Sequence, residues 1–297
     1  MSNGKKGAVG IIGLGIMGGA FARNLAAAGW QVKGFDIDPA RCAELSEAGV
    51  EIAANVAAIA QSVPAIITSL PSPKALEQVA REIAVVKGRK LVVVEMSTFA
   101  LEDKAKLEKI LADAGHVLLD CPVSGTGAQA RLKDLVIYAS GERASIAALR
   151  PMFADFSRQV HDLGAFGNGS RMKYIANLLV AIHNVAAAEA MALGMKAGLN
   201  AQKVFDVIST SAGTSRMFEI RGPMMVAGEY DEATMRMSMW QKDLDIIGTF
   251  AKSLGAPTPT FDATLPVYAA ALAAGFGAQD TGAVCAVLEA KAGVKRG

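Results

Sequence analysis

Short apolar runs alternate with longer amphipathic segments between residue 8 and about residue 163. Six of the short runs have the composition and length of β-strands. They cover residues 8–12, 31–35, 65–69, 91–95, 117–120 and 135–139. The segments between them have helical periodicity. The pattern therefore predicts an α/β unit, in which a parallel sheet is covered by helices.

The segment 170–197 is built largely from Ala, Leu, Met and Ile and predicts one long helix. Its polar residues Lys173, Asn177 and Asn184 fall on one narrow face, and the other faces are almost wholly apolar. We therefore expect a buried helix between two folded halves, with one polar stripe facing a cleft. The sequence assigns Asn184 no role beyond that of a structural hydrogen-bonding residue.

Residues beyond position 200 show helical periodicity and no convincing strand. Predicted helices cover approximately residues 201–211, 215–221, 239–254, 259–274 and 280–292. Glycine and proline residues mark the breaks between them. The second half is therefore predicted to be all-helical, and its apolar excess favours a homodimer or homotetramer.

Two apolar segments raise the question of a membrane or a secretion signal. The uncharged stretch 174–188 is too short to span a bilayer and contains Asn177, His183 and Asn184. Near the amino terminus, basic residues precede an apolar run, but glycines interrupt that run. We predict neither a membrane span nor a targeting segment.

Composition narrows the class of protein. The chain has 297 residues, of which 52% are hydrophobic, and its 30 basic and 28 acidic residues give a net charge of +2. Without a basic run, this balance argues against a nucleic-acid partner. Cys42, Cys121 and Cys285 are odd in number and widely spaced, which favours a reducing cytoplasm. The three histidines lack ligand spacing, so no metal site is predicted.

The first strand runs directly into a glycine-rich segment made of Gly13, Leu14, Gly15, Ile16, Met17 and Gly18. A helix follows, so this spacing provides a tight turn and a close backbone approach to a pyrophosphate at the helix amino terminus. Asp36 ends the second strand, where a carboxylate accepts hydrogen bonds from ribose hydroxyls. Together these features predict dinucleotide binding. NAD is favoured over NADP because the first arginine after Asp36 is Arg41, which already lies on the next helix; NADP remains possible.

Three later loops follow the carboxyl ends of predicted strands, where ligands bind in open α/β sheets. Residues 69–73 and residues 96–98 are expected to face the cofactor, although each has an equally good interpretation as a turn with a capping Ser or Thr. Residues 120–127 are rich in backbone and hydroxyl donors suited to a carboxylate, through Ser124, Gly125 and Thr126.

Five motifs in this order resemble those of the β-hydroxyacid dehydrogenase family, which includes 3-hydroxyisobutyrate dehydrogenases and tartronate semialdehyde reductases. They are residues 13–18, 69–73 and 120–125, the run from Gly167 to Asn177, and residues 242–244. The resemblance implies a Rossmann-type domain over residues 1–164, an interdomain helix over 165–198 and an all-α domain over 199–297. It also implies NAD(P)-dependent interconversion of a short hydroxy acid and its aldehyde or ketone.

The resemblance also suggests roles for individual residues. Lys173 matches the catalytic lysine and Asn177 matches a substrate-positioning asparagine. Further matches are substrate-loop residues Ser124, Gly125 and Thr126, and cofactor contacts Leu70, Pro71, Thr98 and Lys242. The chain departs from many relatives at Ala176, at Thr126 in place of a second glycine, and at Lys133-Asp134-Leu135 in place of Gly-Thr-Leu. The acceptor pocket is therefore expected to differ, and the sequence assigns no role to Arg131.

Hydride transfer from an alcohol requires a group that takes the hydroxyl proton and returns it in the reverse direction. A lysine does both when its surroundings lower its pKa towards the working pH. A lysine in a first helical turn is electrostatically disfavoured, which favours a functional reason for Lys173. Two alternatives stay open: a catalytically inactive NAD(P)-binding interaction protein, and an imine reductase, whose relatives generally lack this lysine.

Overall fold

The computed structural model describes residues 6–296, and the chain divides into two compact units, Met1–Lys173 and Tyr174–Gly297. Residues 1–5, part of the segment considered as a signal peptide, lie outside the described residues. Each unit has its own hydrophobic core, so each is a folded body in its own right.

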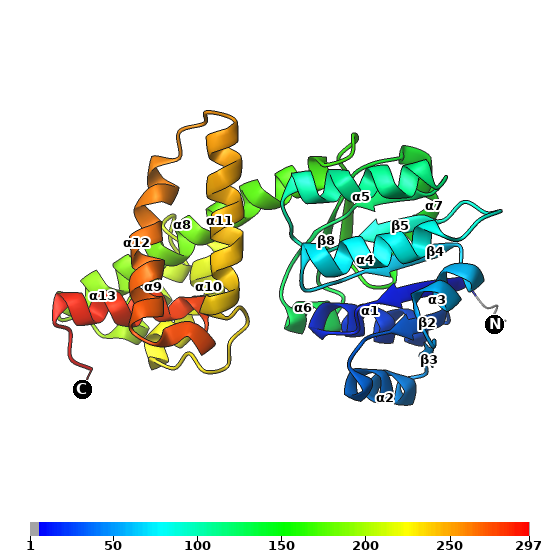
Figure 1. Ribbon diagram of the computed structural model, residues 1–297. Coiled ribbons are helices and arrows are strands. Elements are labelled where there is room, and N and C mark those ends of the chain that lie inside the picture. Colours follow the sequence, from blue (N-terminus) through cyan, green and yellow to red (C-terminus); the bar gives the residue numbers. More distant parts are fainter. Residues whose placement is uncertain (1–5, 297) are drawn as a thin grey trace. The chain divides into compact units, whose positions relative to one another are not determined.

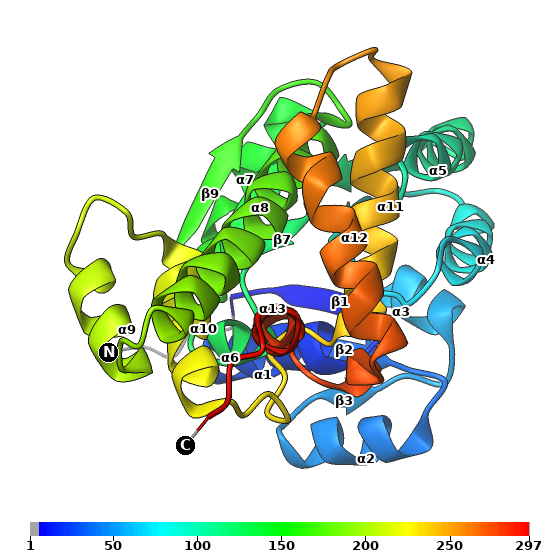
Figure 2. The same cartoon turned by 90° about the vertical axis from the view of Figure 1, so that its left-hand side faces the viewer.

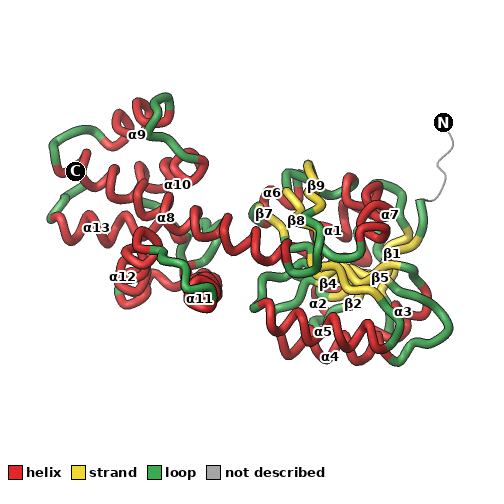
Figure 3. The backbone as a smooth tube through the Cα atoms, turned by 90° about the horizontal axis from the view of Figure 1, so that it is seen from above, coloured by secondary structure: helices red, strands yellow, loops and turns green. Residues whose placement is uncertain are grey.

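A parallel six-stranded sheet forms the centre of the first unit, in the order β3-β2-β1-β4-β5-β6 (Figures 1 and 3). Its strands are β1 (Ala8–Ile12), β2 (Gln31–Phe35), β3 (Glu51–Ile52), β4 (Ala65–Thr68), β5 (Val92–Glu95) and β6 (Val117–Asp120). The helices are α1 (Ile16–Ala27), α2 (Pro39–Glu47), α3 (Val56–Ser62), α4 (Pro73–Ala84) and α5 (Leu101–Asp113). This is the parallel sheet covered by helices that the alternating pattern predicts, in the Rossmann-type arrangement that the family resemblance implies.

One predicted strand does not join this sheet. The strand expected over residues 135–139 is β8 (Val136–Ala139), which belongs to a three-stranded sheet with β7 (Val123–Ser124) and β9 (Gln159–Asp162). The helices α6 (Gly127–Arg131) and α7 (Arg143–Ala154) connect these strands. Within the described residues, only the bridge between Asp120 and Ser140 joins β6 to the end of β8. The sequence does not predict β3, β7 or β9, because β3 and β7 have two residues each and β9 contains a single apolar residue, Val160.

The long helix α8 (Asn168–Lys196) begins and ends within two residues of the prediction. By length and composition it could cross a membrane, the one helix of the described chain that could, but the core helix of a soluble protein passes the same test. Its Ala181, Ala188 and Met191 lie in the core of the second unit. The prediction of burial on nearly all faces is wrong for the single chain, because Ile175 and Leu193 are 51% and 72% exposed.

The second unit is all-helical, as predicted, and Figure 2 shows α11 and α12 side by side in it. Besides α8, it contains α9 (Ala201–Ser209), α10 (Arg216–Ala227), α11 (Met237–Ser253), α12 (Pro259–Ala273) and α13 (Val284–Ala292), with short 3₁₀ turns at Phe276–Ala278 and Thr281–Ala283. Glycines in the left-handed region end α10 and α13, at Gly228 and Gly293.

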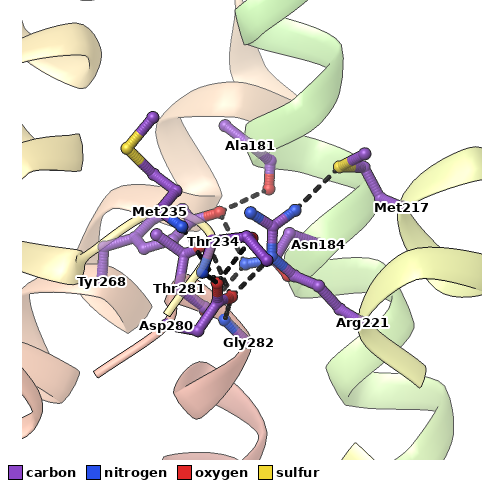
Figure 4. A network of polar contacts seen from close by, with 10 residues as sticks. All are labelled: Ala181, Asn184, Met217, Arg221, Thr234, Met235, Tyr268, Asp280, Thr281 and Gly282. Atoms are coloured by element: carbon purple, nitrogen blue, oxygen red, sulfur yellow. Dashed lines mark hydrogen bonds and ion pairs between the residues drawn. The ribbon is translucent and has the colours of Figure 1, made fainter. Parts of the chain in front are cut away.

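A buried polar network joins the helices of this unit (Figure 4). Asp280 pairs with Arg221 through a 2.8 Å contact between Oδ1 and Nε, and both side chains are almost fully buried. The amide of Asn184 donates to the Tyr268 hydroxyl at 3.1 Å and to the Thr281 carbonyl at 2.9 Å. The polar stripe on α8 is therefore structural at Asn184.

Candidate active site

The glycine-rich turn between β1 and α1 forms a close-packed cradle. Gly13 has φ +89°, and a Cβ there would collide with the Ser69 carbonyl. A Cβ at Gly18 would collide with the Gly13 carbonyl, so the helix and the turn touch directly. The N-cap of α1 is Gly15, and no side chain caps this helix. Its first N–H groups are therefore available to an anion, which fits the pyrophosphate of a dinucleotide.

Asp36 is bound to the same turn. Its Oδ2 accepts the Leu14 N–H at 2.7 Å, and its Oδ1 accepts the Asp38 N–H at 2.9 Å. The side chain of Asp38, not that of Asp36, caps α2. Asp36 thus lies at the end of β2 beside the cradle, where the sequence places the ribose contact.

Arg41 contradicts one expectation drawn from the sequence. Its position on α2 suggests that it is out of reach of the ribose site, but its guanidinium lies 3.5 Å from Asp36 Oδ2. A Cβ at Gly15 would lie 3.3 Å from the same guanidinium. The side chain is long enough to return from the first turn of α2. A positive charge therefore stands beside Asp36, and the position of α2 alone is no argument against NADP.

The two predicted cofactor loops are hydrogen-bonded to each other. The Leu70 N–H donates to Ser97 Oγ at 3.0 Å, and the Ser97 N–H donates to Glu95 Oε1 at 2.7 Å. Ser72 caps α4, as the alternative interpretation requires for residues 69–73, whereas the N-cap residue of α5 is Ala100. Because β1, β4 and β5 are adjacent and parallel, Leu70, Pro71 and Thr98 share the carboxyl edge of the sheet with the glycine-rich turn.

A fully buried ion cluster lies at this edge, and of its three residues only Asp120 belongs to a sequence motif. Lys104 Nζ is 2.6 Å from Glu95 Oε2 and 2.8 Å from Asp120 Oδ1, and all three side chains are 0% exposed. Burial alone would lower the pKa of Lys104, but the two carboxylates raise it well above its ordinary value. A sequence signal exists: Lys104 shares the buried face of α5 with Leu107 and Leu111.

The cluster also fixes the beginning of α8. Asp120 Oδ2 accepts the Ser170 N–H and Oδ1 accepts the Ser170 hydroxyl, both at 2.7 Å. The Gly169 N–H donates to Ser140 Oγ at 2.9 Å, and a Cβ at Gly169 would collide with the Tyr138 carbonyl. Lys173 follows three residues after Ser170 and is half-buried. The first turn of α8 is thus attached to the end of β6, and Lys173, the sixth residue of the helix, lies in the turn that follows rather than in the first turn that the sequence suggests.

The predicted substrate loop has an internal support. Thr126 caps α6 in a reciprocal capping box with Gln129, and Gln129 Nε2 donates to Asp134 Oδ2 at 3.1 Å. Gly125 has φ +135°, which requires glycine, and Ser124 is half-buried beside it. Two of the sequence departures, at Thr126 and Asp134, are therefore linked through Gln129.

In the second unit, Asn177 and Asp243 form a buried pair. The Asn177 amide donates to Asp243 Oδ2 at 2.9 Å. Lys242 Nζ lies 3.6 Å from Asp243 Oδ1, and its side chain is 49% exposed. The sequence leaves open whether Asp243 orients Lys242 or caps the backbone; its carboxylate orients Asn177 as well.

Known proteins resemble the chain along its whole length. A model described as the NAD binding domain of 6-phosphogluconate dehydrogenase matches residues 8–164, and one described as the NAD-binding domain of NADP-dependent 3-hydroxyisobutyrate dehydrogenase matches residues 167–288. L-threonate dehydrogenase of Escherichia coli K12 is 34% identical, over 96% of this chain and 95% of its own. 2-(Hydroxymethyl)glutarate dehydrogenase of Eubacterium barkeri is 29% identical, over 96% of both chains.

A crystal structure described as 3-hydroxyisobutyrate dehydrogenase from Salmonella typhimurium superposes with a TM-score of 0.85. It is 32% identical, and the match covers 95% of this chain and all of the other. The resemblance thus extends over both units. The chain belongs to the 3-hydroxyisobutyrate dehydrogenase family of β-hydroxyacid dehydrogenases, and it is an NAD(P)-dependent oxidoreductase of hydroxy acids.

Proposed function

We propose that the enzyme interconverts a short β-hydroxy acid and its semialdehyde or keto form, with Lys173 as the general acid and base. The observation that carries this proposal is the attachment of the first turn of α8 to Asp120 through two 2.7 Å hydrogen bonds. A proton-transfer group must be held in one place relative to the reacting bond. The attachment fixes the start of the helix, and Lys173 lies in the turn that follows, in the unit that also contains the glycine-rich cradle.

Bound NAD(P) supplies the hydride acceptor or donor in this chemistry. Lys173 takes the hydroxyl proton during oxidation and returns it to the carbonyl oxygen during reduction. Asn177, four residues later on the same helix, positions the substrate oxygen. Its amide is oriented by the 2.9 Å hydrogen bond to Asp243, so the remaining polar atoms of the amide have a fixed direction.

Substrate and cofactor contacts complete the proposal. Ser124, Gly125 and Thr126 bind the substrate carboxylate through N–H and hydroxyl groups. Leu70, Pro71, Thr98 and Lys242 contact the cofactor, and Asp36 binds the adenosine ribose and favours NAD. L-threonate is our first candidate substrate, because the 34%-identical relative is named for it and it carries a hydroxyl β to its carboxylate.

The experiment that tests the activity is a measurement of absorbance at 340 nm with NAD or NADP and a panel of hydroxy acids. The panel contains L-threonate, 3-hydroxyisobutyrate and 2-(hydroxymethyl)glutarate. We expect turnover with at least one of them and a higher kcat/KM with NAD than with NADP. Cofactor binding without turnover of any member would favour the alternative, an interaction protein that has lost catalysis.

The Lys173→Ala variant tests the acid–base assignment. It should bind NADH as the wild type does, while kcat falls by roughly 10²- to 10⁴-fold, the usual contribution of such a group. Lys196→Ala, at the exposed far end of the same helix, is the matched control and should keep full activity. Near-normal turnover of Lys173→Ala would exclude the assignment and reopen the imine-reductase alternative.

Two further properties belong to the proposal. A cytoplasmic location is supported by Cys42, Cys121 and Cys285, all of which are free thiols. A homodimer or homotetramer is supported by the apolar excess of the helical unit. Light scattering of the purified enzyme measures the oligomeric state directly.

A further inference from the structure

We propose that Lys104 is a positioning residue which, through Glu95 and Asp120, ties the cofactor loops to the start of the helix that carries Lys173. The proposal rests on the function proposed above for Lys173. Lys104 and Glu95 lie outside the sequence motifs, and Asp120 is the first residue of the 120–125 motif but has no role assigned to it there. All contacts that support it lie within the first unit.

The cluster has two ends with different targets. At one end, Glu95 Oε1 accepts the Ser97 N–H, and Ser97 Oγ accepts the Leu70 N–H, so this end reaches both cofactor loops. At the other end, Asp120 accepts the backbone N–H and the hydroxyl of Ser170, so this end reaches α8. Lys104 stands between the ends with contacts of 2.6 and 2.8 Å. A displacement at either end therefore changes the surroundings of the shared ammonium.

Stability alone is a poor explanation for this arrangement. Removing three charged groups from water costs several kcal/mol per ion, and apolar residues of similar volume often stabilise a core equally well. Glu95, Lys104 and Asp120 are nevertheless all completely buried. A charge-assisted hydrogen bond fixes distance and direction more strictly than apolar packing does. The cluster thus fixes the position of the cofactor loops relative to the start of α8.

Conservative variants of the two carboxylates separate the two ends. The cluster has one cation and two carboxylates. Asp120→Asn and Glu95→Gln each leave Lys104 with one carboxylate, so the buried charges become balanced and the chain should fold. Lys104→Met leaves two carboxylates without their cation and is the less informative change. Lys109→Met is the matched control, because Lys109 is on the same helix but its pair with Asp113 is exposed.

For Asp120→Asn we expect kcat to fall about ten- to a hundredfold, because a small displacement of a reacting group has an effect of this size. The Kd for NADH should stay within about threefold of the wild type, since binding does not require a placed acid–base group. Backbone hydrogen exchange at Gly169 and Ser170 should become faster.

For Glu95→Gln we expect the Kd for NADH to rise about tenfold, the effect of one charge-assisted hydrogen bond. Exchange at Ser97 and Leu70 should increase.

The proposal is overturned if both variants match Lys109→Met in kcat and in NADH affinity while only their unfolding temperature falls. It is also overturned if both variants lose kcat and affinity to the same extent, because general damage has that signature. Absence of turnover in the wild type rejects the proposed function instead. In that case the NADH titrations and the hydrogen exchange at Gly169 and Ser97 still show whether Glu95 acts on the cofactor loops and Asp120 acts on the start of α8.

Discussion

Lys133 is the single non-glycine residue with positive φ among residues 6–296, at φ +60°. It stands where the sequence shows Lys-Asp-Leu and many family members have Gly-Thr-Leu. A residue with a Cβ is disfavoured in this region by about 1 kcal/mol or more. The conformation brings Asp134 to Gln129 at 3.1 Å and to Arg158 at 2.9 Å. The backbone strain at Lys133 is thus balanced by contacts of the next residue, which support the proposed substrate loop.

Lys133→Gly should therefore stabilise the enzyme. Relief of the left-handed strain outweighs the extra flexibility of the unfolded chain, for a net gain of about 0.5–1 kcal/mol. A rise in the midpoint of thermal unfolding checks this expectation. The exposed Lys109 provides the control, because it lies inside α5, where glycine is disfavoured. Lys109→Gly should lower the midpoint.

Asp36 and Arg41 are expected to act in opposite directions on cofactor choice. Asp36→Ala should weaken NADH binding and narrow the gap to NADPH, because the acceptor for the ribose hydroxyls is lost. Arg41→Ala should weaken NADPH more than NADH, because its guanidinium lies 3.5 Å from Asp36, the proposed ribose contact, and would pair with a 2′-phosphate there. Fluorescence titrations with both cofactors measure the four affinities. Equal effects of Arg41→Ala on both cofactors would show that Arg41 serves only its ion pairs with Asp36 and Asp38.

At the scale of elements, the sequence predicts what repeats along the chain and misses what depends on a single distant contact. The strands β1, β2 and β6 are predicted to the residue because each is a continuous run with a clear end. The pattern misses the second sheet because β7 has two residues and β9 contains a single apolar residue, Val160. It misses Lys104 for a different reason. A lysine on an amphipathic helix is ordinarily solvated, and only the placement of Glu95 and Asp120 shows that this one is not.

The same limit applies to the candidate site. Glycine spacing identifies the cradle because backbone geometry alone demands it. Asp36, Asn177 and Asn184 bond to Leu14, Asp243 and Tyr268 respectively. These partners are 22, 66 and 84 residues away along the chain, and no local pattern encodes them. Arg41 shows that an element boundary does not limit the reach of a long side chain.

The pair between α10 and the segment before α13 gives a prediction for the helical unit. Burial tends to raise the pKa of Asp280, but the charge of Arg221 and hydrogen bonds from Gly282 and Thr234 hold it below its ordinary value. A carboxyl with a depressed pKa adds stability that is present above its unfolded pKa, about 3.9. That stability is lost as the pH falls through the lower folded value.

Arg221→Met should therefore cost about 3–5 kcal/mol of unfolding free energy at pH 7, because it leaves Asp280 buried without its cation. The cost should shrink as the pH falls towards 4, because burial without the Arg221 charge raises the pKa of Asp280 in the folded variant, so the carboxyl becomes neutral there before it does so in the unfolded chain. Urea unfolding followed by circular dichroism at pH 7 and pH 3.5 measures the difference. Arg216→Met is the control on the same helix, since its pair with Glu219 is exposed, and it should cost less than about 1 kcal/mol.

At the scale of the whole molecule, each unit contains a fully buried thiol. Burial raises the pKa of Cys121 in the first unit, and the nearby charge of Asp120 adds to the effect. Burial also raises the pKa of Cys285 in the second unit, where the thiol donates to Glu289 Oε1 at 3.1 Å. Both groups therefore favour the folded chain as neutral thiols. Their contribution is complete below the unfolded pKa of about 8.5 and is lost as the pH rises towards the higher folded values.

Between pH 8 and pH 10 the stabilising contribution of each thiol should decrease by about 2 kcal/mol. Above the unfolded pKa, the unfolding free energy falls by at most about 1.4 kcal/mol per pH unit for each such group. Buried tyrosines add little in this window, because their unfolded pKa is about 10; burial raises the pKa of Tyr268 to about 12. In Cys285→Ala the decrease of the unfolding free energy between pH 8 and pH 10 should be about 2 kcal/mol smaller than in the wild type. Cys121→Ala should have the same effect independently, because the two residues lie in different units. Urea unfolding at pH 7, 8, 9 and 10 separates this slope from the constant cost of each cavity. Parallel curves for wild type and Cys285→Ala would show that the thiol does not stay protonated on folding.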